Sequence, residues 1–542
     1  KIYTSAGILL LSLFCIGDAV AKDAKFETGV SFGSTGADEP YSSLTDKDGN
    51  YYISGTCRGD VEFAGGATIK GRGGMDAVIV KYDAELNFLW ARAVGGSKDD
   101  TFERIAVTSA GDIVAVGKIS GDVTIDGTDQ TLSGTQSTDG CIVVYDKDGN
   151  YKSSAQIKAA GASLCYSVAV DKSDNIFVTG STVGATDFGN EKTVTIEGSN
   201  PGTFLACYNN SLVCQWAIAG SSPVQSYGWA VNFDKEENIL LTGRFGTTFT
   251  ITGTDGEALT TAVGSESSQD TYVAKLSHEG VGQWITYVTN SNRIDTRSID
   301  SDSQGNVYIW GHCQSAVTPE GQSPLGFNGN FDSFLIKYSS AGAYLDGMNL
   351  GGSGRDEAKS LFVDADDNIY VAGNVNGDGS KGGTAVNMNP RGESKDYTFK
   401  GHDGYVAKYN GSTWELMQLE KTVTPDNANQ HEVAWCVTMS PDYNKVYVTG
   451  YFNNGATVFD GASLTLPFVR DYDIYTVLYS YTLMVKTKTL EPGVANEPYY
   501  SNIVVDNVEG TVKFEIVSGT LPDGITLSED GAFAGTPTKN GS

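Results

Sequence analysis

A short apolar strand that ends in glycine recurs seven times along the chain. The copies end at Gly55, Gly117, Gly180, Gly243, Gly311, Gly373 and Gly450. Successive copies lie 62, 63, 63, 68, 62 and 77 residues apart. These strands are apolar at nearly every position, which is typical of strands that are buried on both faces. Such regular steps predict a repeat architecture.

Each copy contains four predicted strands. An apolar strand, as at 105–107, leads into a turn rich in Asp, Gly and Asn, as at 171–175. The glycine-ended strand follows, and a long polar segment then leads to a third strand, as at 76–82. A short turn gives a fourth strand, which often carries tryptophan, as at Trp90. Seven such copies predict an all-β, seven-bladed β-propeller of four-stranded antiparallel blades, with a solenoid as the alternative.

The two ends of the repeat region complement each other. The seventh copy lacks the tryptophan-type fourth strand, whereas residues 26–32 form an unattached strand before the first copy. We expect this N-terminal strand to pair into the last blade and close the ring. Closure removes the exposed strand edges that would otherwise favour aggregation.

The repeat resembles a known family. The pattern G-G-S-G-x-D, then x-A-V-D-x-x-G-N-x-Y-V-x-G, then D-x-F-V-A-K-Y, resembles the SBBP β-propeller repeats of exported bacterial proteins. The resemblance covers about residues 26–482 and is closest in the first, fifth and sixth copies. It implies a propeller fold and export, and it carries no catalytic residues.

The pattern changes beyond Leu490. Residues 491–493 form a linker-like turn, and the motif G-x-L-P-D-G-I-T-L-x-x-D-G-x-x-x-G-T-P-T over 519–538 resembles the immunoglobulin-like (cadherin-like) modules of bacterial surface proteins. About 50 residues are too few for a sandwich of ~100 residues. The expected organisation is therefore a signal peptide, the propeller, a linker and a truncated immunoglobulin-like domain, at 1–21, 26–482, 483–492 and 493–542.

The first residues resemble an export signal. An apolar run covers 8–16, and Ala19-Val20-Ala21 provides an A-x-A cleavage site. Cys15 raises lipidation as an alternative, but the residues before it lack the small side chains of a lipobox. No later apolar stretch reaches about 20 residues, so we expect no transmembrane segment. These features predict a secreted or cell-surface protein.

The charge restricts the class of partner. The chain has 37 Lys and Arg against 66 Asp and Glu, a net charge of -29. A field of this sign repels phosphate backbones, so nucleic acid is excluded as a partner. The same field attracts divalent cations without identifying a ligand.

Residues with metal-binding chemistry are scattered. The four histidines, His278, His312, His402 and His431, fall at unmatched repeat positions and share no metal-ligand spacing. The Asp-rich turn at 46–50 lacks the glutamate of an EF-hand loop, and it recurs at 146–150 between different strands. We therefore expect structural turns and no cofactor, with calcium as the open alternative.

Three carboxylates occupy one repeat slot, before the first strand of a copy. We expect Asp38, Asp100 and Asp356 to accept backbone N–H bonds and to fix the crossing between blades. Cys207 and Cys214 flank a hairpin turn, where cross-strand β-carbons come near disulfide reach, and an exported protein permits the bond. A disulfide between them is thus a hypothesis, and it would leave an odd cysteine unpaired.

Two functional hypotheses follow. The first is a non-catalytic binding, adhesion or scaffolding module at the bacterial surface, whose partner is a glycan or an envelope or extracellular protein. Long second-to-third loops would form its working face, since variable loops on a rigid scaffold usually carry recognition. The sixth-copy insertion supplies the candidate contacts, which are Asn374, Asp378, Lys381, Tyr397, Phe399 and His402.

The alternative is a secreted polysaccharide hydrolase or lyase with an acidic site at the propeller channel. An active site should interrupt the repeat with a distinct catalytic cluster, and the sequence pattern reveals none. The sequence therefore favours a binding protein over an enzyme, assigns no catalytic residue, and leaves the oligomeric state open.

Overall fold

The computed structural model describes residues 10–14, 20–21, 24–134, 138–262, 269–376, 384–399, 401–423, 431–453, 456–459, 462–481, 484–485, 494–506, 508–509, 512–518 and 521–538. These residues form two compact units: the sheet unit, Thr28–Leu478, and the terminal unit, Lys1–Glu27 with Tyr479–Ser542. Strands provide almost all regular structure, and the described helical residues are confined to the short η1 (Ala64–Gly66). The predicted all-β class is confirmed. No helix in the described ranges has the length and apolar character needed to cross a membrane.

Four antiparallel strands form the common part of each large sheet in the sheet unit, and in most sheets they follow chain order. The first four sheets contain β4 (Glu39–Thr45), β5 (Tyr51–Cys57), β8 (Asp76–Tyr82), β9 (Phe88–Gly96); β10 (Thr101–Val107), β11 (Ile113–Ile119), β14 (Asp139–Tyr145), β15 (Tyr151–Ala159); β16 (Ser163–Val170), β17 (Ile176–Thr182), β20 (Gly202–Tyr208), β21 (Cys214–Ser221); β22 (Ser226–Phe233), β23 (Ile239–Phe245), β26 (Asp270–Leu276) and β27 (Gly282–Thr289).

The remaining large sheets follow the same plan. They contain β28 (Ile294–Ser301), β29 (Val307–Cys313), β31 (Asp332–Tyr338), β32 (Tyr344–Leu350); β33 (Glu357–Val363), β34 (Ile369–Asn376), β37 (His402–Tyr409), β38 (Leu416–Val423); β39 (Glu432–Met439), β40 (Lys445–Phe452), β43 (Asp473–Ser480) and β3 (Lys25–Phe32). The last sheet departs from chain order, because its outer strand β3 comes from the N-terminal side of the chain.

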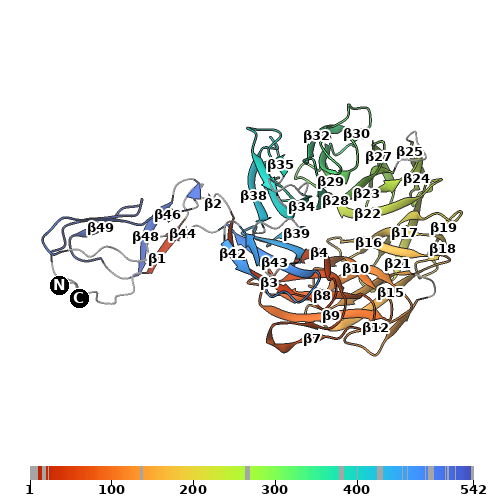
Figure 1. Cartoon of the computed structure of the whole chain (residues 1–542), viewed down its shortest axis with the longest axis horizontal. Coiled ribbons are helices and arrows are strands. Elements are labelled where there is room, and N and C mark those ends of the chain that lie inside the picture. The colour runs from red at the N-terminus through yellow and green to blue at the C-terminus, as the bar shows by residue number, and fades with distance from the viewer. Residues whose placement is uncertain are drawn as a thin grey trace. The chain divides into compact units, whose positions relative to one another are not determined.

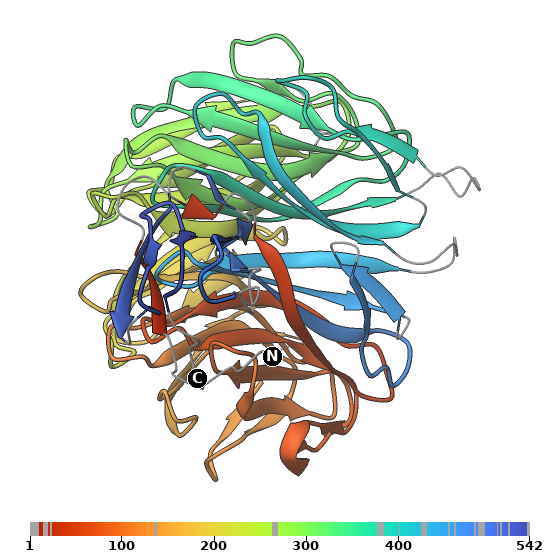
Figure 2. The same ribbon diagram turned by 90° about the vertical axis from the view of Figure 1, so that its left-hand side faces the viewer.

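The first strands of these sheets lie around a common centre. Each contacts the first strands of two neighbouring sheets, in the cycle β4, β10, β16, β22, β28, β33, β39 and back to β4. Figures 1 and 2 show the sheets around this centre, with neighbours stacked face to face. The arrangement is propeller-like.

Apolar side chains fill the space between neighbouring sheets. Successive residues of one strand contribute to different layers: Tyr51 and Ile53 pack with Tyr447 of the last sheet, whereas Tyr52 packs with Ile113 of the second. Because successive strand residues point to opposite faces, a strand that is covered on both faces must be apolar throughout. This is the physical origin of the unalternating pattern in the sequence.

Many second-to-third connections extend a neighbouring sheet instead of forming free loops. The strands that continue the outer edge of the preceding sheet are β12 (Asp122–Ile125), β13 (Thr131–Ser133), β18 (Gly184–Asp187), β19 (Thr193–Ile196), β24 (Thr248–Thr252), β25 (Ala258–Ala262), β30 (Thr318–Pro319), β41 (Ala456–Phe459) and β42 (Ala462–Thr465). Two further hairpins form separate pairs, namely β6 (Val61–Glu62) with β7 (Thr68–Ile69) and β35 (Thr384–Asn387) with β36 (Asp396–Phe399).

The terminal unit is made of short strand pairs. They are β1 (Leu10–Phe14) with β48 (Lys513–Ser518), β2 (Val20–Ala21) with β47 (Val508–Glu509), β44 (Met484–Val485) with β46 (Val505–Asp506), and the sheet β45 (Tyr499–Asn502), β50 (Ala532–Gly535) and β49 (Ile525–Leu527). Part of the apolar run 8–16, which resembles an export signal, is thus a strand here, and β1 pairs with β48 in antiparallel register.

The proposed Cys207–Cys214 disulfide does not form in this structure, where both cysteines are free and buried. A β-bulge between Cys207 and Tyr208 shifts the register, so that Cys207 lies opposite Trp216 and Tyr208 opposite Cys214. Cys207 and Cys214 consequently belong to different apolar layers, on opposite faces of the sheet. The predicted disulfide requires a regular hairpin, and the bulge removes the proximity of the two cysteines.

Candidate ligand site on the inner strands

The turn that follows each first strand is nearly uniform. In five sheets an Asp accepts hydrogen bonds from the backbone and side chain of the Asn four residues later; these are Asp46, Asp171, Asp234, Asp302 and Asp364. Asp83 and Asp146 build the same turn between third and fourth strands. The repeated acidic turns therefore serve the backbone.

A pocket of about 370 Å³ lies between the turns of four neighbouring sheets. Its lining includes Asp171, Asp234, Asp302 and Asp364, whose oxygens are already occupied by these turns. Asp234 and Asp302 are also paired with Lys275 (2.5 Å) and Lys337 (3.1 Å). The pocket is thus the inner surface of the turn framework.

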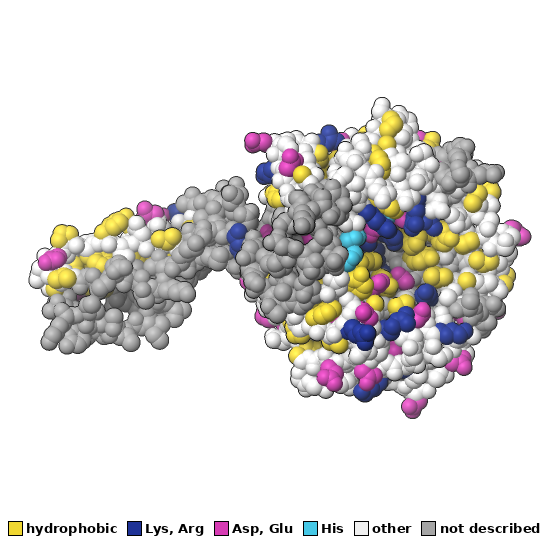
Figure 3. All heavy atoms as spheres, viewed as in Figure 1, with side chains coloured by type: hydrophobic (Ala, Val, Ile, Leu, Met, Phe, Trp, Pro, Cys, Tyr) yellow, Lys and Arg dark blue, Asp and Glu magenta, His cyan; other side chains and the backbone are white. Residues whose placement is uncertain are grey.

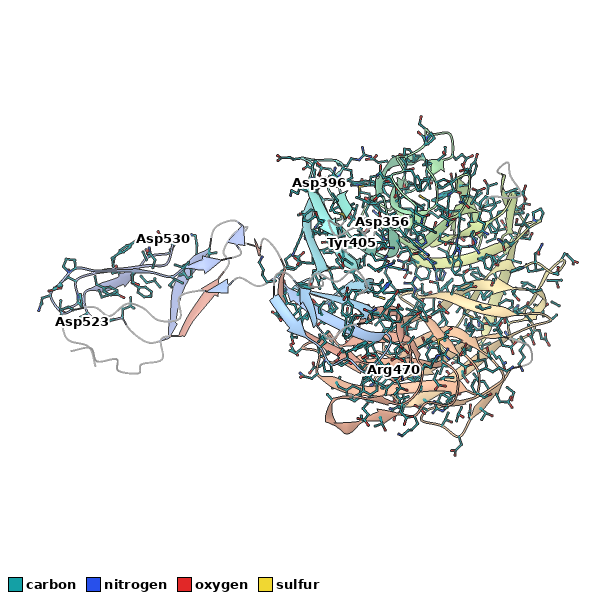
Figure 4. All side chains as sticks on the ribbon, viewed as in Figure 1. Asp356, Asp396, Tyr405, Arg470, Asp523 and Asp530 are labelled. Carbon is teal, nitrogen blue, oxygen red and sulfur yellow. The ribbon has the colours of Figure 1, made fainter. Side chains whose placement is uncertain are left out.

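The three slot carboxylates are buried at the opposite end of the first strands, and Asp356 is labelled in Figure 4. Asp38 accepts hydrogen bonds from the N–H groups of Ser34 (2.5 Å) and Arg58 (2.9 Å). Asp100 and Asp356 make the equivalent pairs of bonds, to Gly96 and Ser120 and to Gly352 and Asn376. Each carboxylate therefore links the segment that precedes the first strand to the start of the connection between the second and third strands.

Burial raises the pKa of these carboxyl groups. The pKa of Asp100 rises to about 6 and that of Asp356 to about 7, because desolvation outweighs their backbone hydrogen bonds. An Asp of the preceding third strand adds to the effect, namely Asp76 for Asp100 and Asp332 for Asp356. A glycine in the segment before the first strand leaves space for Asp76 and Asp332. A Cβ at Gly95 would collide with Asp76, and a Cβ at Gly351 would collide with Asp332.

A β-bulge interrupts every first strand near its beginning. The register shifts by one residue in each of the seven strands and leaves one residue without a cross-strand partner. Such bulges commonly redirect a side chain at a functional site. The residues are Tyr41, Glu103, Tyr166, Trp229, Arg297, Lys359 and Trp435, and we call this set the bulge ring.

All seven residues of the bulge ring are partly buried, and the side chain of Lys359 is only 7% exposed. They differ from one sheet to the next, in contrast to the repeated turns. Aromatic members are in contact: Tyr41 with Trp435 at a ring-centroid distance of 5.7 Å, and Tyr166 with Trp229 at 4.4 Å. The bulge ring is therefore a mixed aromatic and charged surface around the centre of the sheet unit.

Cationic side chains cluster on one side of the bulge ring. Asp295 contacts Arg293 (2.6 Å), Arg244 (3.2 Å) and His312 (3.6 Å). Glu357 similarly contacts Arg355 (2.6 Å) and Lys359 (2.8 Å). The cations hold the pKa of both carboxyl groups below the ordinary range despite burial. Figure 3 shows Lys and Arg side chains gathered near the middle of the sheet unit.

One pair of residues reaches across the centre. The Arg104 guanidinium, on β10, donates a hydrogen bond to the carbonyl of Arg297 on β28 (3.5 Å). Burial raises the pKa of the neighbouring Glu103 carboxyl, while Lys118, Arg297 and Arg104 oppose that rise. The centre between β10 and β28 is therefore bridged by the Arg104 side chain.

The predicted contacts on the sixth-copy insertion fall into three groups. Asn374 (3% exposed) and Phe399 (0%) are buried, so neither presents a side chain to a ligand. Tyr397 is half-buried against the apolar layer that contains Phe399. Asp378 and Lys381 lie outside the described residues. The insertion hairpin β35–β36 thus packs with the fold, which the insertion's length did not reveal.

His402, the remaining predicted contact, stacks on His431 with ring centroids 4.0 Å apart. These histidines belong to different copies and share no spacing along the sequence, but the structure brings them together. Burial, with His431 as a like-charged neighbour, lowers the pKa of His402 to about 4. Within the described ranges, no three His, Cys, Asp or Glu side chains are arranged to hold a metal ion.

The bulge ring was not predicted from the sequence, although the chain contains a signal for it. In the first six copies the ring residue lies 14 positions before the strand-ending glycine, and in the seventh it lies 15 before. The residue two positions later is apolar in six of the seven copies, while this one changes from aromatic to acidic to cationic. A comparison of the copies position by position would have identified it.

Comparison with known proteins agrees with the propeller-like arrangement. Residues 154–189 match the family model described as a β-propeller repeat, SBBP. The chain carries a β-propeller repeat. The predicted SBBP-type repeat is thereby confirmed over this segment, and a β-propeller repeat protein is consistent with a binding or scaffold module.

Other proteins are more distantly similar to this chain, and the similarity to solved structures concerns the fold alone. An uncharacterized WD repeat-containing protein, L264, of Acanthamoeba polyphaga mimivirus is 22% identical over 435 residues. The alignment covers 65% of this chain, which spans about a third (31%) of that protein. A streptogramin B lyase structure has a TM-score of 0.36 and 10% identity, covering 83% of this chain and 97% of its own. The Dos1 propeller has a TM-score of 0.36 and 9% identity, with 84% and 95% covered.

Proposed function

We propose that this chain is an exported, non-catalytic, seven-bladed β-propeller that binds its partner at the bulge ring. The cycle of contacts among the first strands supports seven four-stranded blades. The place of β3 beside β43 supports closure of the ring by the N-terminal strand. In this proposal residues 1–21 act as a signal peptide and 493–542 as a partial immunoglobulin-like domain.

The observation that carries the proposal is the divergence of the bulge ring. The Asp–Asn turn recurs in five of the seven large sheets and the slot carboxylate in four of them, and both serve the backbone or the interior of the fold. The bulge ring instead carries seven partly buried residues of three chemical kinds at one equivalent position. Half-buried aromatic and Arg side chains that converge on one surface are typical of recognition sites. The partner is a glycan or an extracellular or envelope protein at the bacterial surface.

The binding proposal can be tested on arrays. The full chain is applied to printed neutral and acidic glycans and to a set of extracellular-matrix and envelope proteins. We expect selective binding that the double variant Trp229→Phe, Trp435→Phe weakens at least tenfold. The matched control Trp216→Phe changes a half-buried tryptophan on the outer strand β21 and should leave binding unchanged. Absence of selective binding, or equal binding by the double variant, would contradict the proposal.

A secreted polysaccharide-processing enzyme with an acidic channel site is the alternative. Asp295 and Glu357 cannot serve as its proton donor, because their cationic neighbours lower their pKa. Glu103 is the observation that favours this alternative, since burial raises its pKa, as a general acid requires. Turnover of a polysaccharide panel by the wild type, abolished by Glu103→Gln, would establish the enzyme and refute the non-catalytic proposal.

A further inference from the structure

Cations exceed carboxylates on one arc of the bulge ring. The arc spans four neighbouring sheets and runs Trp229, Arg297, Lys359, Trp435. Around it, five cationic side chains meet two carboxylates: Asp295 is shared by Arg244, Arg293 and Arg297, and Glu357 by Arg355 and Lys359. The chain as a whole has a net charge of -29, so the excess of cations on this arc is opposite in sign to the net charge of the chain.

Three of the five cations of the arc are more accessible than their carboxylate partners, whereas Arg244 and Lys359 are largely buried, at 11% and 7% exposed. The side chains of Arg293, Arg297 and Arg355 are 44%, 32% and 51% exposed. Those of Asp295 and Glu357 are 1% and 14% exposed. The carboxylates bind the guanidinium groups from the buried side, so the solvent-facing edges of these groups remain available to an anion. A planar guanidinium binds a carboxylate or sulfate through two parallel hydrogen bonds.

Aromatic side chains flank the cations at both ends of the arc. Trp229 lies against Tyr166 and Tyr227 at one end, with the Arg297 guanidinium 5.2 Å from its ring centroid. At the other end, Lys359 Nζ lies 4.1 Å from the centroid of Trp435. These contacts fix the cations in position before any ligand arrives, which reduces the entropic cost of binding.

We propose that this arc binds an anionic saccharide, with its carboxylate or sulfate groups on Arg293, Arg297 and Arg355 and its ring faces on Trp229 and Trp435. This inference rests on the proposed function. Aromatic rings provide flat apolar faces for the C–H surface of a sugar, and the guanidinium groups read its charge. A long phosphate polymer is disfavoured by the strongly acidic remainder of the chain.

Isothermal titration of the full chain tests the inference. The probes are tetragalacturonic acid, a chondroitin sulfate tetrasaccharide, a neutral galactose tetrasaccharide and ATP. We expect at least tenfold tighter binding of an acidic than of the neutral saccharide, and a weakening with added salt. The relative affinities of the uronate and the sulfated probe distinguish the two sources of charge.

Matched variants then localise the charge recognition. Arg293→Gln with Arg355→Gln should weaken acidic-saccharide binding at least tenfold and leave neutral binding unchanged. Arg391→Gln is the control, because Arg391 is similarly exposed (37%) and pairs with Asp346 on β32, away from the inner strands. Equal affinity for acidic and neutral saccharides, preference for ATP, or an unaffected double variant would overturn the inference. If the array shows ring-dependent binding of neutral glycans or proteins alone, the inference fails and the proposed function stands; if no ring-dependent binding occurs, both fail.

Discussion

The two ends of each first strand differ in how strictly they repeat. At the turn end, five of the seven sheets use the same Asp and Asn pair, and the second and seventh replace the Asp with Thr108 and Ser440, whose hydroxyls still accept backbone bonds. At the bulge end, the equivalent position is Tyr, Glu, Tyr, Trp, Arg, Lys or Trp. Each sheet needs the same turn to connect its strands, whereas no sheet needs a particular side chain at the bulge. The uniform end is therefore structural, and the divergent end is available for recognition.

The largest effect on stability should come from the insertion hairpin. Phe399 is fully buried in an apolar layer with Val386 and Met388. Phe399→Ala should lower the free energy of unfolding by about 3–5 kcal/mol, since it removes buried apolar surface and leaves a cavity. Chemical denaturation measures this change. A change below about 1 kcal/mol would show that the hairpin is dispensable for stability, as a recognition loop would be.

The next effect should come from the turn end. Asp302 accepts bonds from the N–H of Gln304, from Asn306 and from Tyr308, and it pairs with Lys337. Asp302→Ala removes the hydrogen bonds of the turn, leaves the buried Tyr308 hydroxyl and the largely buried Lys337 without this partner, and should cost about 3 kcal/mol. Asp302→Thr imitates Thr108 of the second sheet and should recover part of the loss. If both variants denature like the wild type, the repeated turn is not structural.

The Asp302 turn should also respond to acid. Its hydrogen bonds and Lys337 lower the pKa of Asp302 below the ordinary value despite burial. Its stabilising contribution is therefore complete above the unfolded pKa of about 4 and is lost as the pH falls through the folded pKa. Asp302→Asn should remove this acid-dependent part of the unfolding curve. An unchanged slope between pH 5 and pH 2 would contradict the assignment.

A smaller effect, of opposite sign, is expected at Glu432, which occupies the slot of Asp38 in the last sheet. Burial and the neighbouring Asp403 raise the pKa of Glu432 to about 8. The stability it contributes is present below the unfolded pKa of about 4.3 and is lost as the pH rises through about 8. Glu432→Gln should therefore stabilise the protein at pH 8 by about 1 kcal/mol or more and have little effect at pH 4. The measurement is Tm across this range, and equal Tm values at pH 8 would refute the raised pKa.

The sequence revealed the framework more fully than the site. The glycine-ended strands, which are apolar at successive positions, predicted the all-β fold. A strand that is buried on both faces must be apolar throughout, and this pattern is visible in the sequence. The bulge ring was missed because a bulge shifts a strand by one residue, and hydrophobic periodicity does not record that shift. The Cys207–Cys214 hypothesis failed for the same reason. The pairing of His402 with His431 depends on contact between neighbouring sheets, which no local pattern encodes.

The most direct test of the division between a structural framework and a divergent binding ring is hydroxyl-radical footprinting of the full chain with saturating tetragalacturonic acid. Aromatic side chains are reactive probes, and the bulge ring contains four of them. We predict that the ligand lowers the labelling of Trp229 and Trp435 and leaves Trp216, on the outer strand β21, unchanged. Protection that is confined to other surfaces, or no protection at any residue, would contradict the account.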